Sequence, residues 1–276
     1  MIAQKRVLTI QDISCVGRCS LTVALPIISA AGIETAILPT AVLSTHTGGF
    51  DGYTYRDLTA DMRPVTAHWK ALGLTFDGIY TGYLGSFEQI ELVSEIFDEF
   101  RAENGKILID PVMGDNGKLY AGFTPEFAAG MAALCGKADV IMPNLTEAAF
   151  MLGEEYRESY DRAYIEGILK RLLALGCKNA VLTGVGFSPS ELGAATYDGS
   201  EFRYYSTKRI DGYYHGTGDI YAGAFTANYV RGDSIYLAAS KAADFVLACI
   251  EKKLEIGGEV RYGVPFELCL HMLSGE

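Results

Sequence analysis

The sequence predicts an α/β protein whose mostly parallel sheet is covered by helices on both faces. Short apolar runs rich in β-branched residues recur along the chain and are separated by longer stretches with helical spacing. These runs are continuous instead of alternating, which is typical of strands buried on both faces. The 276 residues are 49% hydrophobic and 21% charged, as in compact globular proteins. We therefore expect one domain over residues 1–276.

Five apolar runs are expected to form the strands. They cover residues 7–10, 35–38, 107–109, 140–142 and 180–183. Two segments between them, 87–100 and 165–173, repeat apolar residues every three or four positions and are predicted to be amphipathic helices. Between residues 194 and 206, short β-like runs flank Asp198-Gly199, a favoured hairpin turn. This segment predicts an antiparallel ribbon at one edge of the sheet.

Residues 40–61 form a segment that we expect to be irregular. It carries Gly48, Gly49 and Gly52 among polar and aromatic residues. Loops of this length inside compact domains often serve binding or catalysis, so a lid or flap over a site is one interpretation. A solvated connection without function is the other.

The charge and the cysteine content limit which partners the protein can bind and which cellular compartment it is expected to occupy. The chain has 34 acidic and 23 basic residues, a formal net charge of −11, which argues against nucleic acid and anionic membrane partners. The longest apolar runs are shorter than the roughly 20 residues of a membrane span, and the first fifteen residues lack a signal-peptide core. The six cysteines form no CxxC pair, so we expect reduced thiols in a cytoplasmic protein.

The segment Gly216-Thr217-Gly218-Asp219 is the most informative one for chemistry. The chain has neither a GxxxxGK[ST] phosphate loop nor a GxGxxG motif after its first strand. The two glycines instead precede a nearly all-apolar run that is long enough for a buried helix, and the free N–H groups of its first turn would bind an anion. Asp219 would then accept the proton of an attacking alcohol. The alternative is that Asp219 only caps the helix.

Two further segments place carboxylates after predicted strands. In Asp-Pro-Val-Met-Gly-Asp at 110–115, Asp110 ends a strand and Asp115 lies in the following loop. Both would face the crevice where ligands of α/β sheets bind, and this pair suits Mg²⁺ held with nucleotide phosphates; ordinary turn formation is the alternative. Asn144 and Glu147 follow the next strand and have the spacing of a capping box, although Glu147 would also reach a metal through water.

In this order, the motifs at 110–115, 143–147 (Pro-Asn-Leu-Thr-Glu) and 216–219 resemble the ribokinase superfamily of small-molecule kinases. Within it, three more motifs resemble the pyridoxal (vitamin B6) kinases. They are Ile10-Gln11, Ser-Thr-His-Thr-Gly at 44–48 and Thr-Gly-Tyr-Leu-Gly-Ser at 81–86. The resemblance runs from about residue 5 to about residue 255.

The resemblance implies a three-layer α/β/α fold, a homodimer, and ATP-dependent phosphorylation of the 5′-hydroxymethyl group of a B6 vitamer. It implies that Asp219 is the catalytic base and that the anion hole is formed by Gly216, Thr217 and Gly218. Around Mg²⁺ and the ATP phosphates it places Asp110, Asp115 and Glu147. It places Tyr120 near the phosphates, in the loop after Asp115, and Asn144 and Thr183 on the nucleotide side. The pyridine pocket would be lined by His46, Thr47 and Tyr83. Family members also respond to a monovalent cation such as K⁺, whose site the sequence does not locate.

One position departs from the B6 kinase pattern. Where those kinases read Ile-Gln-Ser, this chain has Ile10-Gln11-Asp12, with Ser14 two residues on. Hydroxymethylpyrimidine kinases of thiamin synthesis carry an Asp in the equivalent stretch, so this kinase class is the alternative. Residues 15–20 lack the Gly-Gly-Ala-Gly character of that class, and residues 81–86 favour B6. We hypothesise that Asp12 favours a vitamer with a protonated ring nitrogen or amine, such as pyridoxamine.

A non-catalytic sensor that retains the fold is the remaining alternative, because a fold alone does not establish activity. The intact Asp219 with its two glycines argues against it, since a sensor needs no base.

Overall fold

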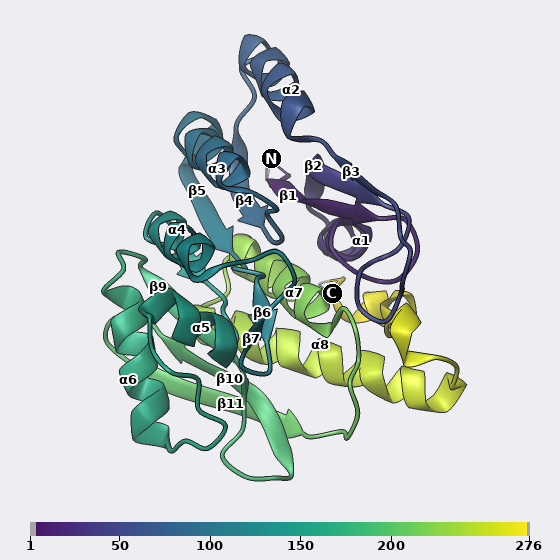
Figure 1. Ribbon diagram of the computed structural model, residues 1–276, viewed down its shortest axis with the longest axis vertical. Helices are drawn as coiled ribbons and strands as arrows, with labels where there is room; N and C mark the ends of the chain where they lie inside the picture. The colour runs from purple at the N-terminus through teal and green to yellow at the C-terminus, as the bar shows by residue number, and fades with distance from the viewer. Residues whose placement is uncertain (1–3, 275–276) are drawn as a thin grey trace.

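A nine-stranded sheet forms the centre of the computed structural model, which describes residues 4–274 (Figure 1). Its strands are β1 (Arg6–Ser14), β2 (Glu34–Leu43), β3 (Tyr55–Asp57), β4 (Phe76–Thr81), β5 (Arg101–Ile109), β8 (Val140–Ile141), β9 (Asn179–Val185), β10 (Glu191–Tyr197) and β11 (Phe202–Lys208). They are ordered β11-β10-β9-β8-β5-β4-β1-β2-β3. All neighbouring pairs from β9 to β2 are parallel, whereas β3, β10 and β11 are antiparallel to their neighbours. A separate hairpin is formed by β6 (Gly114–Asp115) and β7 (Lys118–Leu119).

Eight α-helices are present in the described residues. They are α1 (Leu21–Ala30), α2 (Thr59–Ala71), α3 (Phe87–Phe100), α4 (Pro125–Cys135), α5 (Leu145–Leu152), α6 (Arg162–Leu173), α7 (Thr217–Arg231) and α8 (Ile235–Ile256). Two 3₁₀ segments, η1 (Val260–Tyr262) and η2 (Phe266–Met272), follow α8. None of the helices in this part of the chain is long and apolar enough to cross a membrane.

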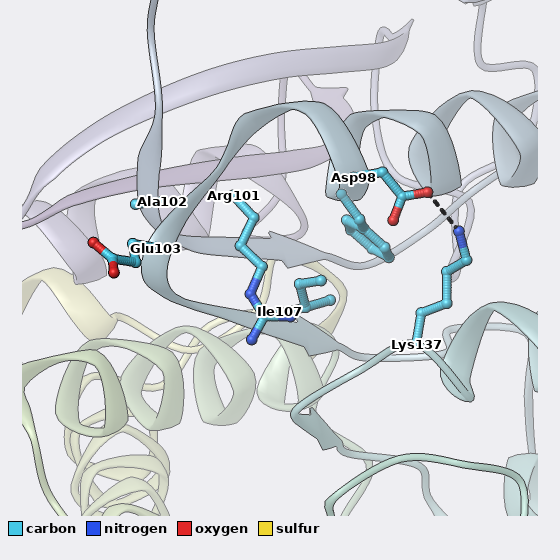
Figure 2. A pocket seen from close by; sticks show the side chains of 7 residues that line it. Asp98, Arg101, Ala102, Glu103, Ile107 and Lys137 are labelled. Carbon is cyan, nitrogen blue, oxygen red and sulfur yellow. Dashed lines mark hydrogen bonds and ion pairs between the residues drawn. The ribbon is translucent and has the colours of Figure 1, made fainter.

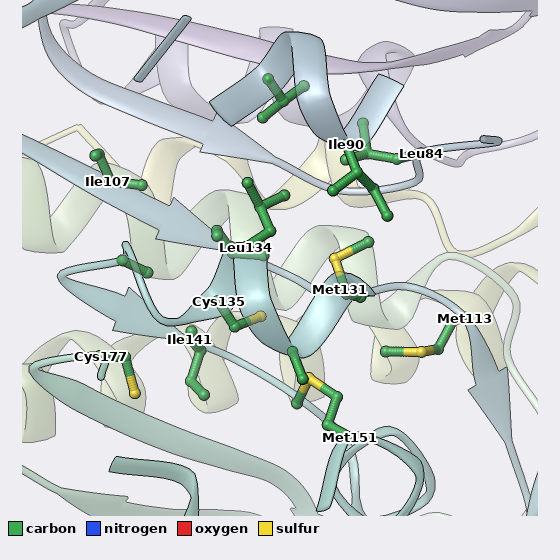
Figure 3. Packing of buried hydrophobic residues seen from close by; sticks show 14 of the residues in the cluster. Leu84, Ile90, Ile107, Met113, Met131, Leu134, Cys135, Ile141, Met151 and Cys177 are labelled. Atoms are coloured by element: carbon green, nitrogen blue, oxygen red, sulfur yellow. The ribbon is translucent and has the colours of Figure 1, made fainter. Parts of the chain in front are cut away.

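The helices form two layers because successive strand residues point to opposite faces of the sheet. On β1, Val7 joins an apolar cluster with α1, α7 and α8, whereas Leu8 joins the cluster with α2 to α6. Figure 3 shows part of the second cluster, where side chains of β5, α4 and α5 interdigitate. Both faces are therefore buried, and the predicted three-layer α/β/α fold is confirmed.

Most predicted elements are present. All five expected strands form, the segments 87–100 and 165–173 fall on α3 and α6, and the ribbon β10–β11 lies at the edge of the sheet. In its turn, Asp198 accepts hydrogen bonds from the backbone N–H groups of Ser200 and Glu201 at 2.9 and 2.8 Å. This local bonding explains why the turn was visible in the sequence.

Strand β4 was missed because Asp77 and Gly78 interrupt its apolar pattern. Both residues have structural reasons to be there. Asp77 accepts a hydrogen bond from the backbone N–H of Arg6 at 2.9 Å. A Cβ atom on Gly78 would lie 2.9 and 3.0 Å from methyl groups of Val230 and Val7, so only glycine lets α7 pack this closely on the sheet.

The expectation that all of residues 40–61 is irregular was wrong at both ends. Strand β2 continues to Leu43, β3 pairs antiparallel with it, and α2 begins at Thr59. The short strand β3 has exposed residues, so its backbone pairing with β2 and not burial defines it. Only residues 44–54 form an irregular loop, which we call the flap loop.

Candidate active site

The predicted site residues gather at the carboxyl ends of the central strands, where α/β proteins bind their ligands. Asp12 lies near the end of β1, and Asp110 follows β5 directly. Asp219 lies in the first turn of α7. The three carboxylates are close enough that the charge of Asp219 is felt by Asp110 and that of Asp12 by Asp219. Segments far apart in the chain thus converge on one site.

The N-terminus of α7 has the properties expected of an anion hole. Gly216 precedes the helix with φ 77°, and no side chain caps the helix. The hydroxyl of Thr217 donates to the carbonyl of Tyr214 at 3.0 Å, which holds the turn in place. The N–H groups of the first turn therefore have no side-chain acceptor, and the positive end of the helix dipole favours an anion beside Gly218.

Asp219 is buried next to this N-terminus. Burial raises its pKa from 3.8 to about 7, and the nearby charge of Asp12 adds to the rise. The backbone N–H of Ser20 and the thiol of Cys19 interact with the carboxylate and lower this pKa. A carboxylate that titrates near neutrality suits a general base.

Asp110 and Glu147 form a second pair of buried carboxylates. Burial raises the pKa of Glu147 to about 8, and burial together with the charge of Glu147 raises that of Asp110 well above its usual range. A divalent cation would relieve this repulsion, so the pair fits a Mg²⁺ ion bound mainly by nucleotide phosphates. No group of three or more His, Cys, Asp or Glu residues within 4–274 is arranged to hold a metal by itself.

Asn144 and Glu147 form the capping box that their spacing predicts. Asn144 Oδ1 accepts from the backbone N–H of Glu147 at 2.9 Å, and Glu147 Oε2 accepts from that of Asn144 at 2.8 Å. The other oxygen of Glu147 accepts from the N–H of Met113 at 3.2 Å. Thr183 bridges to Asn144 through the backbone. The structural role is thus present, and contacts of Asn144 and Thr183 with a nucleotide stay a prediction.

Asp115 and Tyr120 lie on and after the β6–β7 hairpin. Asp115 accepts from the backbone N–H of Asn116 at 2.8 Å and is also contacted by the hydroxyl of Tyr213. The N–H of Tyr120 donates to Met113 O at 2.9 Å. The hairpin therefore lies between the carboxylate pair and the segment that leads into α7, and the charge of Asp115 contributes to the raised pKa of Glu147.

The predicted substrate residues lie on the β1 side of Asp219. Asp12 is 5% exposed, and Ser14 Oγ donates to its carboxylate at 3.0 Å. Tyr83 packs against Phe123 with ring centroids 5.6 Å apart, and burial raises its pKa to about 12, so its hydroxyl stays a donor at neutral pH. Thr47 is exposed in the flap loop.

His46 attaches the flap loop to two other segments. Its Nδ1 accepts from the backbone N–H of Gly48 at 3.1 Å, so Nε2 carries the proton that is donated to Arg261 O at 2.6 Å. Its ring also lies 5.2 Å from that of His215, the residue that precedes the anion hole. Both ring nitrogens are therefore used within the protein, and a contact of His46 with the substrate ring stays a prediction.

Three residues beside the site were missed in the sequence. Cys19 and Ser20 contact Asp219, and Tyr55 of β3 lies with its hydroxyl close to Gly85. Ser20 directly precedes the helical residues of α1. A serine at this position predicts an N-cap and gives no indication of a contact with Asp219. The remaining contacts bring together separate segments, so no local pattern marks them.

A separate cavity lies away from this site (Figure 2). Its lining includes Arg101, Ile107 and Lys137, and Lys137 pairs with Asp98 at 2.8 Å. It is located where β5 begins, at the opposite end of the strand from Asp110. No titratable group of the candidate site lines it.

Comparisons with known proteins agree with this geometry. Residues 25–263 match the family described as Phosphomethylpyrimidine kinase. A hydroxymethylpyrimidine/phosphomethylpyrimidine kinase of Bacillus subtilis is 30% identical over 225 residues, which cover 79% of each chain. A pyridoxine kinase of the same bacterium is 33% identical over 190 residues, covering 67% of each chain.

A solved structure from Bacteroides thetaiotaomicron, provisionally named a phosphomethylpyrimidine kinase, is 37% identical. It superposes with a TM-score of 0.94 and covers 98% of this chain and 94% of its own. A second crystal form of that protein, with pyridoxal, superposes with a TM-score of 0.91. By sequence, fold and site geometry, the chain therefore belongs to the phosphomethylpyrimidine kinase family and is a kinase.

Proposed function

We propose that this kinase transfers the γ-phosphoryl group of ATP to the 5′-hydroxymethyl group of a vitamin B6 vitamer. The observation that carries the proposal is the pairing of Asp219, buried with a pKa of about 7, with the uncapped N-terminus of α7. The first supplies a base for an alcohol, and the second stabilises charge on the phosphoryl oxygens. A non-catalytic sensor would need no such base.

In this mechanism the substrate hydroxyl lies between Asp219 and the N-terminus of α7. Asp219 accepts the hydroxyl proton as the oxygen attacks the γ-phosphorus in line. The N–H groups of Gly218 and its neighbours stabilise the transferring group, and positioning supplies most of the rate. Because Asp219 titrates near neutrality, enough of it is ionised at neutral pH to act as the base.

On the nucleotide side, Asp110 and Glu147 are the residues that would hold Mg²⁺ with the ATP phosphates. When bound, the ion neutralises charge on the phosphate oxygens. The backbone N–H groups of Asn144 and Met113 hold the carboxylate of Glu147 in place, so it needs no rearrangement to meet a cation. Asp115, Tyr120, Asn144 and Thr183 complete the proposed nucleotide side.

Two observations favour a B6 vitamer over a pyrimidine. The relative from Bacteroides thetaiotaomicron was crystallised with pyridoxal at 37% identity, and the relative with 33% identity is a pyridoxine kinase. In this chain, Tyr83 offers an aromatic face, and the buried Asp12 offers a carboxylate to a protonated ring nitrogen or amine. The family description and the relative of 30% identity make hydroxymethylpyrimidine the second candidate.

The test is ADP release with Mg-ATP across pyridoxal, pyridoxine, pyridoxamine and hydroxymethylpyrimidine. The wild type and Asp219→Asn are assayed in parallel. Turnover of a B6 vitamer that Asp219→Asn abolishes supports the proposal. Turnover of the pyrimidine alone assigns the protein to thiamin synthesis, and turnover of none of them supports the sensor.

A further inference from the structure

Ser20 has a backbone conformation that is rare for a residue other than glycine. Its φ is 53° and its ψ is −131°, and among residues 4–274 only Asn116 also combines a side chain with positive φ. Such a conformation is strained and persists only where the surroundings enforce it. Strain of this kind at a site calls for a functional explanation.

The contacts of Ser20 supply a functional explanation for this strain. The β-bridge between Ser20 and Ile13 places Ser20 beside Asp12. Its hydroxyl lies against the carboxylate of Asp12 and its backbone N–H faces that of Asp219, and both interactions lower the pKa of the carboxyl that they meet. Ser20 is the N-cap of α1, yet its side chain makes no cap hydrogen bond. The hydroxyl that ordinarily stabilises a helix is used on Asp12 instead, so one residue touches both carboxylates of the substrate side.

The neighbours of Ser20 enforce its strained turn. Thr22 Oγ1 donates to Cys19 O at 2.8 Å, and Arg18 Nε donates to Glu267 at 2.8 Å. Ser20 also forms a β-bridge with Ile13, the residue after Asp12. These contacts fasten residues 17–20 to β1, to α1 and to η2, so the turn has no freedom to relax.

The same turn lies directly against the anion hole. A Cβ atom on Gly216 would overlap Arg18 O and would lie 3.5 Å from Cys19 Sγ. The turn and the start of α7 therefore set each other's position. A shift of residues 17–20 would displace the N–H on Asp219 and the wall of the anion hole together.

We propose that Ser20 is a positioning residue whose strained turn holds the substrate carboxylate Asp12 and the base Asp219 in fixed relation. The inference rests on the proposed function, because it assigns Asp12 to the vitamer and Asp219 to the hydroxyl that is phosphorylated. Ser20 itself does not touch the reacting atoms. It links recognition of the ring to placement of the base.

Two substitutions separate the hydroxyl from the backbone strain. Ser20→Ala keeps the strain and loses the hydroxyl, whereas Ser20→Gly loses the hydroxyl and relieves the strain. The matched control is Ser234→Ala, which removes an ordinary N-cap, since Ser234 has φ −63° and accepts from the N–H of Leu237. The measurements are kcat and KM for the preferred vitamer, its Kd by calorimetry without ATP, and Tm.

We expect Ser20→Ala to raise KM and Kd about tenfold, as for one lost hydrogen bond to a charged group, with kcat within about threefold. Ser20→Gly should raise KM as much as Ser20→Ala does. Its kcat should be about tenfold lower than that of Ser20→Ala, and its Tm should be higher. Ser234→Ala should lower Tm only.

If Ser20 had a purely structural role, activity would fall together with Tm. Loss of activity in a Ser20→Gly variant that is more stable than Ser20→Ala therefore distinguishes a positioning role from a structural one. KM and Kd of both Ser20 variants within twofold of wild type would overturn the inference, as would a Ser20→Gly variant less stable than Ser20→Ala. If the wild type binds a vitamer but phosphorylates nothing, the proposed function fails, and the Kd values and Tm order still decide the role of Ser20. A wild type that binds no vitamer overturns both.

Discussion

Gly216 lies so close to Arg18 that a Cβ atom on Gly216 would overlap the carbonyl oxygen of Arg18. Gly216 also has φ 77°, which disfavours any residue with a side chain. The start of α7 and the turn before α1 can therefore lie this close together only because residue 216 is a glycine. Gly218, two residues on, has no atom within 4 Å of its own Cβ position.

The first prediction compares these two glycines. Gly216→Ala should lower the free energy of unfolding by about 2 kcal/mol or more, from the disfavoured φ and the overlap. Gly218→Ala should raise it by about 0.5–1 kcal/mol, because alanine is the better residue inside a helix. Denaturant titration followed by circular dichroism measures both. Equal effects of the two substitutions would show that the turn moves away freely.

The second prediction concerns the base. Asp219→Asn should lower kcat by about 10²–10⁴, the usual contribution of a general base. Nucleotide affinity should stay within a few-fold, because the proton is transferred only in the transition state. Steady-state kinetics and calorimetry with ATP check the two parts. Unchanged turnover would remove Asp219 from this role.

The third prediction is that the same substitution stabilises the protein at high pH. Burial raises the pKa of folded Asp219 to about 7 from 3.8, so the folded state holds the proton more tightly than the unfolded chain. Folding is therefore penalised progressively between pH 4 and 7 and fully above pH 7.

The amide that Asp219→Asn introduces stays neutral at every pH, and the variant should be more stable than the wild type by about 2–4 kcal/mol at pH 8. The difference should vanish near pH 4. Tm measured from pH 4 to pH 8 gives the comparison, and a difference independent of pH would contradict the prediction.

The fourth prediction concerns substrate choice. Asp12→Ser should lower kcat/KM for pyridoxamine about tenfold more than for pyridoxal, because a buried carboxylate strengthens a hydrogen bond from a cationic group. Ser14, which donates to Asp12 at 3.0 Å, stays in place as a polar partner for the new hydroxyl. Competition assays with both vitamers report the ratio directly. An unchanged ranking of vitamers would remove Asp12 as a specificity residue.

The fifth prediction separates the two roles of Glu147. Glu147→Gln keeps one acceptor oxygen for the capping box but removes the charge, whereas Glu147→Ala removes both. The Mg²⁺ concentration for half-maximal activity should rise about tenfold or more in both variants, because a carboxylate partner of the ion is lost. Tm should fall clearly further in Glu147→Ala. Equal Mg²⁺ requirements in Glu147→Gln and wild type would leave Glu147 with the capping role alone.

Local patterns explain why much of the fold was predictable. Continuous apolar runs mark β5 and β9 because both strands are covered on both faces. Asp198-Gly199 marks its hairpin because the turn bonds within itself. Strand β4 and the ordered ends of residues 40–61 were not predicted. Gly78 in β4 is explained by contacts with Val7 and Val230, which are distant in sequence, and β3 is exposed and is defined only by its backbone pairing with β2.

The order of residues along the chain is enough to specify the α/β class, the helix that starts after Gly216, and the chemical groups available for phosphoryl transfer. These properties depend on spacing and on turn chemistry within a few residues. Three relationships arise only in the folded chain: Ser20 touches both Asp12 and Asp219, the charge of Glu147 raises the pKa of Asp110, and His46 bonds to the carbonyl of Arg261. The physical reason is that burial and charge repulsion act through space, and only the order of strands in the sheet brings these segments together.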